Sequence, residues 1–296
     1  MHSLQKQFHD FIYTHQLVGK GEKILLAVSG GVDSMVMCSL FRKEQIDFAI
    51  AHCNFGLRGL ESDGDEALVI EWATQNRVSY FIESFDLTGG SIQLEARNKR
   101  YRWFQQLANE NGFQKIATAH HLNDSLETIL MNLTRGTGYK GIAGIPVATD
   151  NIIRPLLFAS KKDLIAYAQE DKIAWREDSS NVKDDYGRNR VRHHVIPELE
   201  KLNPSLLTSF SLTSERLRYS SSIINERVDK IRDEYFSKEG DSGFKLNLSW
   251  LTSGQDLLIL SELLSEFDVN YATAKEIYSS IGKSGKTFLT KYWLIT

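Results

Sequence analysis

Several features that define other classes of protein are missing from this sequence of 296 residues. Only two cysteines are present, Cys38 and Cys53, and they form no C-x-x-C pair. Both lie in apolar runs, so we expect two small buried side chains. No apolar run approaches the length of a membrane span, and no secretory signal peptide is recognisable. We therefore expect a cytoplasmic protein with no membrane partner.

A strong excess of one charge is also missing. The formal net charge is −3 and the pI is about 6.3, so the overall charge does not indicate a nucleic-acid-binding protein. The 35 lysines and arginines still leave room for a local basic surface. A hydrophobic content of 42% is ordinary for a globular protein, and the length suggests two domains.

The glycine-rich stretch 29–34 (SGGVDS) lacks the lysine of a Walker motif, which excludes a Walker-type NTPase. It follows the apolar run 23–26, which predicts a buried strand, and precedes 35–41, which predicts the start of a helix. A turn between a strand and a helix N-terminus binds anions through its backbone N–H groups and the helix dipole. The pattern S-G-G-x-D-S resembles the PP-loop of the ATP pyrophosphatases. That resemblance implies ATP-binding residues, which are Ser29, Gly30, Gly31, Val32, Asp33 and Ser34.

Strand and helix patterns alternate through the first two thirds of the chain. Strands are predicted at 23–26, 48–53, 79–84 and 115–119, with an edge strand at 152–157 and a docking helix within 1–18. This alternation predicts an α/β fold with a doubly wound, mostly parallel sheet, in which ligands bind at the carboxyl ends of the strands. A helix at 160–171 is expected to have Ser160 as its N-cap. Long helical patterns follow, so we predict a catalytic domain at 1–202 and a smaller, mainly helical domain at 203–296.

Acidic and imidazole side chains gather in the stretch 120–127. If the stretch is helical, His120, Asp124 and Glu127 lie on one face, whereas His121 points elsewhere. Two carboxylates near a triphosphate suit Mg²⁺, and the histidine is placed to orient a carboxylate, contact phosphate or move a proton. The alternative is a solvated helix face.

Two basic clusters complete the candidate site. Arg97 and Arg100 share a helix face, and arginine forks suit phosphate oxygens, although a solvated basic face is an equal alternative. The cluster 188–194 (RNRVRHH) lies near the expected domain boundary and is placed to meet nucleic-acid or ATP phosphates. Its alternative is an interdomain hinge of salt bridges.

Together these stretches resemble the tRNA(Ile)-lysidine synthetase family of N-type ATP pyrophosphatases. The matching segments are 29–34, 51–59, 95–101, 119–128, 135–138 and 188–197. The resemblance implies an adenine nucleotide alpha-hydrolase-like fold for the first domain and a tRNA-binding role for the second. Phe55 departs from the family, in which many members carry histidine there. Residues 285–296 resemble mid-domain sequence, so a shortened form is expected.

The family reaction has two steps on the CAU anticodon of an isoleucine tRNA. ATP adenylates the carbonyl oxygen at carbon 2 of the wobble cytidine, and L-lysine then displaces AMP. The implied cofactors are ATP and Mg²⁺, the metal held by Asp33 and Asp124, with a homodimer left open as the assembly. The resemblance also implies roles for further residues. His120 and Arg100 would act near the adenylate phosphate, and Glu127 on the lysine amine. Arg192 would bind the nucleotide or the activated cytidine, and His52 would lie in the nucleotide site.

Three other functions are alternatives to this one. A PP-loop tRNA thiolation enzyme is the nearest alternative, but its chemistry usually needs paired cysteines, which Cys38 and Cys53 do not provide. An amidotransferase synthetase requires a glutaminase, for which the chain has no room. A non-enzymatic RNA-binding module would not need Asp33, Asp124 and Glu127 together.

Overall fold

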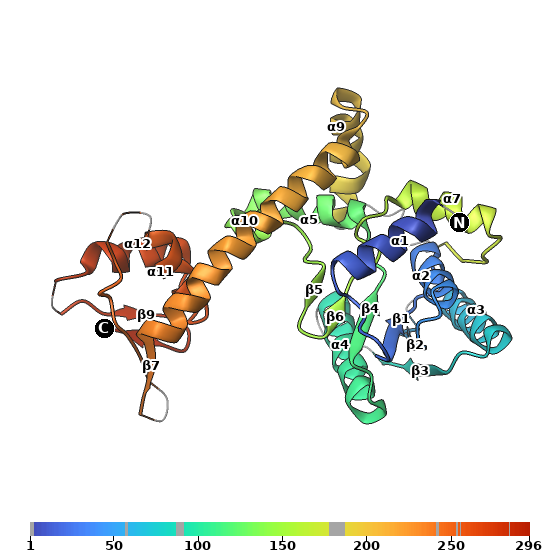
Figure 1. The fold of residues 1–296 in the computed structure, drawn as a ribbon, viewed down its shortest axis with the longest axis horizontal. Helices are drawn as coiled ribbons and strands as arrows, with labels where there is room; N and C mark the ends of the chain where they lie inside the picture. The colour runs from blue at the N-terminus through green and yellow to red at the C-terminus, as the bar shows by residue number, and fades with distance from the viewer. Residues whose placement is uncertain are drawn as a thin grey trace. The chain divides into compact units, whose positions relative to one another are not determined.

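The computed structural model describes residues 3–56, 59–86, 92–177, 187–240, 243–252, 254, 256–283 and 285–296. The chain divides into two compact units, residues 1–215 and 216–296 (Figure 1). This division falls within helix α10 (Leu206–Tyr235), whereas the sequence suggested a boundary at Leu202, ahead of the helix.

The first unit contains a six-stranded sheet with the order β3-β2-β1-β4-β6-β5. Its strands are β1 (Ile24–Ala27), β2 (Phe48–Asn54), β3 (Tyr80–Ser84), β4 (Lys115–Thr118), β5 (Ala148–Thr149) and β6 (Ile152–Ile153). All neighbouring pairs are parallel except β5 with β6. The predicted doubly wound sheet is confirmed. The strand expected at 152–157 is present but shorter, as β6 (Ile152–Ile153) followed by an isolated bridge between Leu156 and His121. It is not the edge strand, because β5 pairs on its outer side.

Helices connect and cover these strands. They are α1 (Ser3–Thr14), α2 (Val32–Lys43), α3 (Leu60–Asn76), α4 (Ile92–Asn111), α5 (Leu122–Arg135), α6 (Tyr139–Ile142), α7 (Lys161–Glu170), α8 (Gly187–Arg190), the π-helical turn η2 (Val191–Val195) and α9 (Ile196–Leu202). Ser160 caps α7 by accepting a hydrogen bond from the Asp163 N–H, as predicted.

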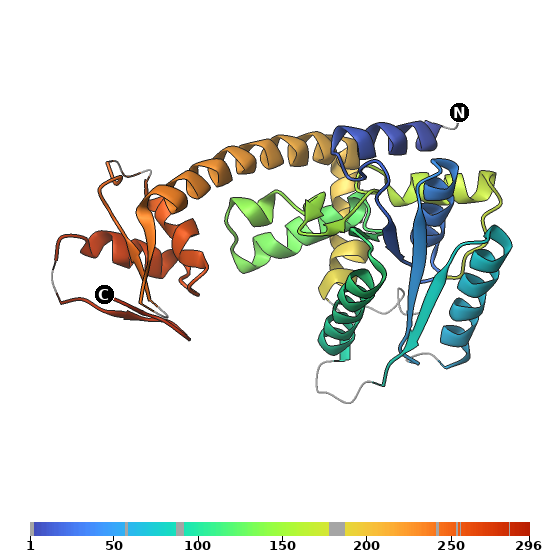
Figure 2. The ribbon, with the colours of Figure 1, turned by 60° about the horizontal axis from the view of Figure 1, so that its bottom comes forward.

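The two faces of the sheet form two separate hydrophobic cores, because successive strand residues point to opposite faces. Ile24 and Leu26 of β1 pack with α1, α2, α3 and α7, whereas Leu25 between them packs with Phe104 and Leu107 of α4. Figure 2 shows α4 on one side of the sheet and α2 and α3 on the other. The sheet is therefore covered on both faces, so ligands reach it at the ends of its strands.

The order in which successive strands are added to the sheet reverses at β1, although the strands remain parallel. From β1 the chain moves outward to β2 and β3, and then returns to place β4 on the other side of β1. The carboxyl ends of β1 and β4 consequently lie side by side, with the PP-loop after one and His120 after the other. Such a switch point is where open parallel sheets bind ligands.

The second unit is built on the C-terminal part of α10 and two short helices, α11 (Asp256–Ser265) and α12 (Tyr271–Ser280). Val228 and Ile231 of α10 pack against Trp250 and the apolar face of α11. Two antiparallel pairs complete it, β7 (Phe236–Glu239) with β8 (Gly243–Leu246), and β9 (Phe288–Leu289) with β10 (Leu294–Ile295). Among all the helices described in the chain, none is long and apolar enough to cross a bilayer.

The docking of α1 offers a test of the first core. Phe8 is completely buried, and its ring meets that of Phe41 at 5.5 Å between centroids. Phe8→Ala is expected to lower the free energy of unfolding by about 3–5 kcal/mol, because it removes buried surface and leaves a cavity. Urea denaturation measures this loss, with the exposed Gln7→Ala on the same helix as control. Equal stability of the two variants would show that α1 is not part of the core.

Candidate active site

A cleft of about 730 Å³ opens at the carboxyl ends of β1 and β4. It brings together the predicted residues Ser29, Asp33, Ser34, Arg100, His120, Asp124, Glu127 and Arg192. The remaining predicted residues Gly30, Gly31, Val32 and His52 are not among its lining side chains. The cleft thus unites segments that lie more than a hundred residues apart in the sequence.

Hydrogen bonds of two serines fix the shape of the PP-loop. The Ser34 hydroxyl accepts a hydrogen bond from the Ser29 N–H at 3.2 Å and donates to the Gly31 carbonyl at 2.9 Å. Gly31 is the N-cap of α2 and has no side chain that could occupy the free N–H groups of the first helical turn. Those groups remain for an anion, which is the chemistry that the sequence predicted.

Gly30 is required by its backbone. Its φ of +87° belongs to a region that residues with a Cβ rarely adopt, and a Cβ there would lie 3.3 Å from Asp65. The Gly30 carbonyl accepts a hydrogen bond from the Arg176 N–H at 3.1 Å, and the Arg176 side chain pairs with Asp65 at 3.0 Å. Arg176 and Asp65 therefore brace the loop from outside the cleft.

His52 lies beneath the loop. Its side chain is buried, and its Nδ1–H donates to the carbonyl of Val28 at 2.8 Å. Burial lowers the pKa of His52, which favours a neutral ring. This position supports the strand that leads into the loop, and direct contact with a nucleotide stays a prediction.

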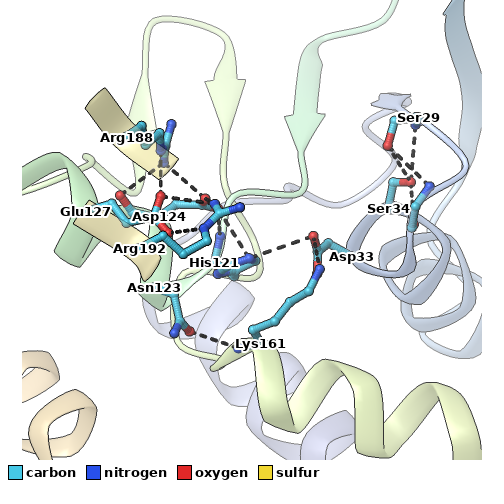
Figure 3. A network of polar contacts seen from close by, with 11 residues as sticks. Ser29, Asp33, Ser34, His121, Asn123, Asp124, Glu127, Lys161, Arg188 and Arg192 are labelled. Atoms are coloured by element: carbon cyan, nitrogen blue, oxygen red, sulfur yellow. Dashed lines mark hydrogen bonds and ion pairs between the residues drawn. The ribbon is translucent and has the colours of Figure 1, made fainter. Parts of the chain in front are cut away.

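The polar stretch after β4 differs from the expected helix face. Helix α5 begins at Leu122, so His120 precedes the helix and His121 is its N-cap. His121 is 5% exposed, and its Nε2 lies 3.7 Å from Asp33 Oδ2 and 3.6 Å from Asp124 Oδ2 (Figure 3). The expectation that His121 points elsewhere is wrong, because it assumed a helix that already includes residue 120. His121 instead joins the PP-loop to α5.

His120 contacts a different group. Its Nδ1 is hydrogen-bonded to the Thr118 hydroxyl at 2.9 Å. Burial lowers the pKa of His120 to about 4, and Arg154, Arg188 and Arg97 act in the same direction against the opposing Asp124. At neutral pH the ring is therefore uncharged and presents its second nitrogen as a neutral group.

Lys161, which the sequence reasoning did not single out, is paired with Asp33. Its Nζ lies 2.8 and 2.9 Å from the two carboxylate oxygens. Its backbone N–H donates to Asn123 Oδ1 at 2.9 Å, so the start of α7 is fixed to the start of α5. The signal available in the sequence was the Ser160 N-cap, which places residue 161 in a first helical turn just after the β6 segment.

Arg188 and Arg192 reach back to α5 and hold both of its carboxylates. Arg192 Nε and Arg188 Nε each lie 2.6 Å from a different oxygen of Glu127, whose side chain is 1% exposed. Arg188 Nη2 also donates to Asp124 Oδ1 at 3.0 Å. Burial opposes ionisation of Asp124, but His121 and Arg188 outweigh it and lower its pKa. For Arg192 burial is outweighed by Glu127, which raises the pKa.

The two arginines expected to share a helix face separate in the structure. Arg100 lines the cleft, and its guanidinium lies 5.3 Å from the ring centroid of Phe55, which stacks on Phe85. Arg97 is not a lining residue, and its guanidinium packs over Tyr101 at 5.1 Å. Phe55, the departure from the family pattern, thus contacts an arginine of the cleft through its ring face.

The carboxylates of Asp33 and Asp124 provide two ligands for a magnesium ion, and not the three or more protein ligands of a structural metal site. Both lie near the same nitrogen of His121, and no group of three or more His, Cys, Asp or Glu side chains suited to a metal occurs in the described part of the chain. Mg²⁺ is usually held by one or two carboxylates together with phosphate and water oxygens. This donor set therefore suits Mg²⁺ brought with a nucleotide.

Comparison with known proteins places the chain in a family. The PP-loop domain profile matches residues 1–199. A tRNA(Ile)-lysidine synthase of Bacteroides thetaiotaomicron is 33% identical over 99% of this chain and 69% of its own length. The chain belongs to the tRNA(Ile)-lysidine synthase family. Further members are those of Parabacteroides distasonis, 34% identical over 94% of this chain and 64% of its own length, and Chlorobaculum tepidum, 39% identical over 70% and 67%.

The family fold extends to more distant proteins. The U34-tRNA thiolase NcsA of Methanococcus maripaludis, solved with its [4Fe-4S] cluster, matches with a TM-score of 0.60 and 18% identity over 72% of this chain and 78% of its own. At that identity the likeness concerns the fold alone. The chain spans 64–69% of the length of the three lysidine synthases compared.

The unusual environment of His120 gives a pH prediction. The folded pKa of about 4 lies below the ordinary value near 6.5, so the unfolded chain takes up this proton first. Above the ordinary pKa, His120 does not change the free energy of unfolding. This free energy falls as the pH drops from about 6.5 toward 4, and the loss is complete below pH 4. An NMR titration should show one imidazole with a midpoint near pH 4 that disappears in His120→Asn. A midpoint near 6.5 would contradict the burial of the ring in the folded protein.

Proposed function

We propose that this chain ligates L-lysine to carbon 2 of the wobble cytidine in the CAU anticodon of tRNA(Ile), with consumption of ATP. The observation that carries the proposal is the cleft in which His121 links Asp33 of the PP-loop to Asp124, with Glu127 lining the same cleft. Membership of the family supports the substrates. A reducing cytoplasm suits this chemistry and the two unpaired cysteines, and the homodimer stays a prediction.

In the first step the carbonyl oxygen at carbon 2 of cytidine attacks the α-phosphorus of ATP. The bond to the bridging oxygen of the β-phosphate breaks, and pyrophosphate leaves. The N–H groups of the first turn of α2, where the PP-loop enters the helix, receive the leaving pyrophosphate. Arg100 and Lys161 are the lining cations suited to the charge on the phosphates. Because the oxygen is a weak nucleophile, most of the rate comes from alignment and charge compensation.

We assign Mg²⁺ to Asp33 and Asp124, where it would offset phosphate charge once bound. Lys161 neutralises Asp33 in the structure described here. Nucleotide phosphates offer this lysine a second set of anionic partners, so we expect its Nζ to shift from Asp33 toward phosphate oxygens when MgATP binds. Asp33 then becomes available for the metal.

In the second step the ε-nitrogen of lysine attacks carbon 2 of the activated cytidine. The bond from carbon 2 to the phosphate-linked oxygen breaks, AMP leaves, and the nitrogen loses its proton. Arg188 and Arg192 surround Glu127 with positive charge, which favours the neutral, nucleophilic amine over the ammonium. We assign to Glu127 the role of accepting the proton that the lysine nitrogen loses.

The thiolation alternative is disfavoured by the cysteines. Thiolation of this kind uses a reactive thiolate or a cluster held by several cysteines. Cys38 is buried in α2 as expected, and burial raises its pKa. Cys53 is only half-buried, contrary to the expectation, but desolvation still raises its pKa to about 12. Neither thiol is suited to carry sulfur.

The test is incubation of the protein with ATP, Mg²⁺, labelled lysine and a tRNA(Ile) transcript bearing the CAU anticodon. We expect stoichiometric release of AMP and pyrophosphate and transfer of the label to the tRNA. A transcript in which the wobble cytidine is replaced by uridine is the control and should remain unlabelled. A folded protein that forms neither AMP nor labelled tRNA would refute the proposed reaction.

Glu127→Gln separates the two steps. The amide keeps the size of the side chain but cannot take a proton, so lysine transfer is expected to slow by about 10²-fold or more. Pyrophosphate release without lysine should persist, and adenylated tRNA should accumulate. Loss of pyrophosphate release in a folded variant would place Glu127 in the first step instead.

A further inference from the structure

The carboxylates that line the cleft are not equivalent. Asp33 pairs with Lys161, Asp124 with Arg188, and Glu127 with two arginines. Glu200 also lines the cleft, is exposed to solvent, and has no ion pair or hydrogen bond with any residue that the structure describes. It is therefore the lining carboxylate whose charge is left for a ligand.

The position of Glu200 is set by the packing of α9 on α5. Ile196 is 5% exposed and packs with Leu122 and Leu126 of α5. Glu200 follows one helical turn later, so it projects from the same face of α9 as Ile196. Ile196, Pro197 and Glu200 together form an apolar wall that ends in a negative charge.

We propose that Glu200 binds the α-ammonium group of the lysine substrate, a step that rests on the proposed function. A carboxylate that pairs with an ammonium stabilises its charged form. That suits the α-nitrogen, which stays charged, and does not suit the ε-nitrogen, which must lose its proton to attack. The ε-nitrogen instead belongs near Glu127, where Arg188 and Arg192 oppose a second positive charge.

The apolar part of the wall fits the rest of the substrate. Lysine carries four methylene groups between its two nitrogens, and Ile196 and Pro197 offer them an apolar surface. Glu200 would thereby distinguish lysine from amines that lack an α-ammonium group. Positive charge at one end and apolar contact along the chain define an amino-acid subsite separate from the PP-loop.

Glu200→Gln tests this subsite by steady-state kinetics. Removal of the charge is expected to raise the KM for lysine about tenfold, the loss typical of a charge-assisted hydrogen bond, with pyrophosphate release in the absence of lysine unchanged. Glu198→Gln is the matched control, because Glu198 lies on the same helix, is 66% exposed and pairs with Lys201 outside the cleft. It should leave both measurements unchanged.

A substrate analogue identifies which nitrogen Glu200 contacts. 6-Aminohexanoate keeps the ε-amine and the carboxylate but has no α-amino group, so its KM should be the same for the wild type and Glu200→Gln. An unchanged KM for lysine in Glu200→Gln would overturn the proposal. An equal rise for lysine and the analogue, or a loss of pyrophosphate release, would also overturn it.

Equilibrium binding separates this proposal from the proposed function. Saturation-transfer NMR measures binding of lysine to the wild type and to Glu200→Gln in the presence of MgATP and without tRNA. Weaker binding to the variant alone, in a protein that modifies no tRNA, would keep the subsite and refute the reaction. Equal binding to both, in a protein that forms lysidine, would refute the subsite and keep the reaction.

Discussion

The parallel pairing of β1 with β4 is the constraint on which the rest of the site depends. It places the end of one strand, where the PP-loop turns into α2, beside the end of the other, where His121 caps α5. Two helix N-termini therefore point into one cleft, and their dipoles add to a positive potential without any lysine in the loop. His121 then connects the two helix N-termini, because its Nε2 lies close to both Asp33 of α2 and Asp124 of α5.

Charge compensation is the second organising feature. The cleft holds Asp33, Asp124 and Glu127 close to a region that must accept a polyphosphate, an arrangement that would repel the ligand if those charges were unpaired. Lys161, Arg188 and Arg192 neutralise them and leave a surface that suits anions. These three side chains are partly exposed, so a phosphate bound in the cleft can contact them.

Much of this arrangement could be predicted from the sequence, because strand periodicity and a glycine-rich turn are local signals. The PP-loop, the parallel sheet and the acidic pair Asp124 and Glu127 all follow from residues close together in the chain. His121 was missed because its role depends on a helix boundary that shifts by two residues. Lys161 was missed because its partner Asp33 lies 128 residues away, and pairing at that separation is decided by packing rather than by local pattern.

Glu200 illustrates the limit of sequence reasoning most directly. In the sequence it is one acidic residue in a short charged helix, with no spacing that distinguishes it from Glu198. Only the packing of Ile196 on α5 turns Glu200 toward the cleft and leaves Glu198 to pair with Lys201 in solvent. Ion pairs already neutralise Glu127 and the two aspartates of the cleft, so Glu200 is the lining carboxylate that retains its charge for a ligand. Where neighbouring carboxylates are already neutralised, the unpaired one decides which cationic ligand the cleft accepts.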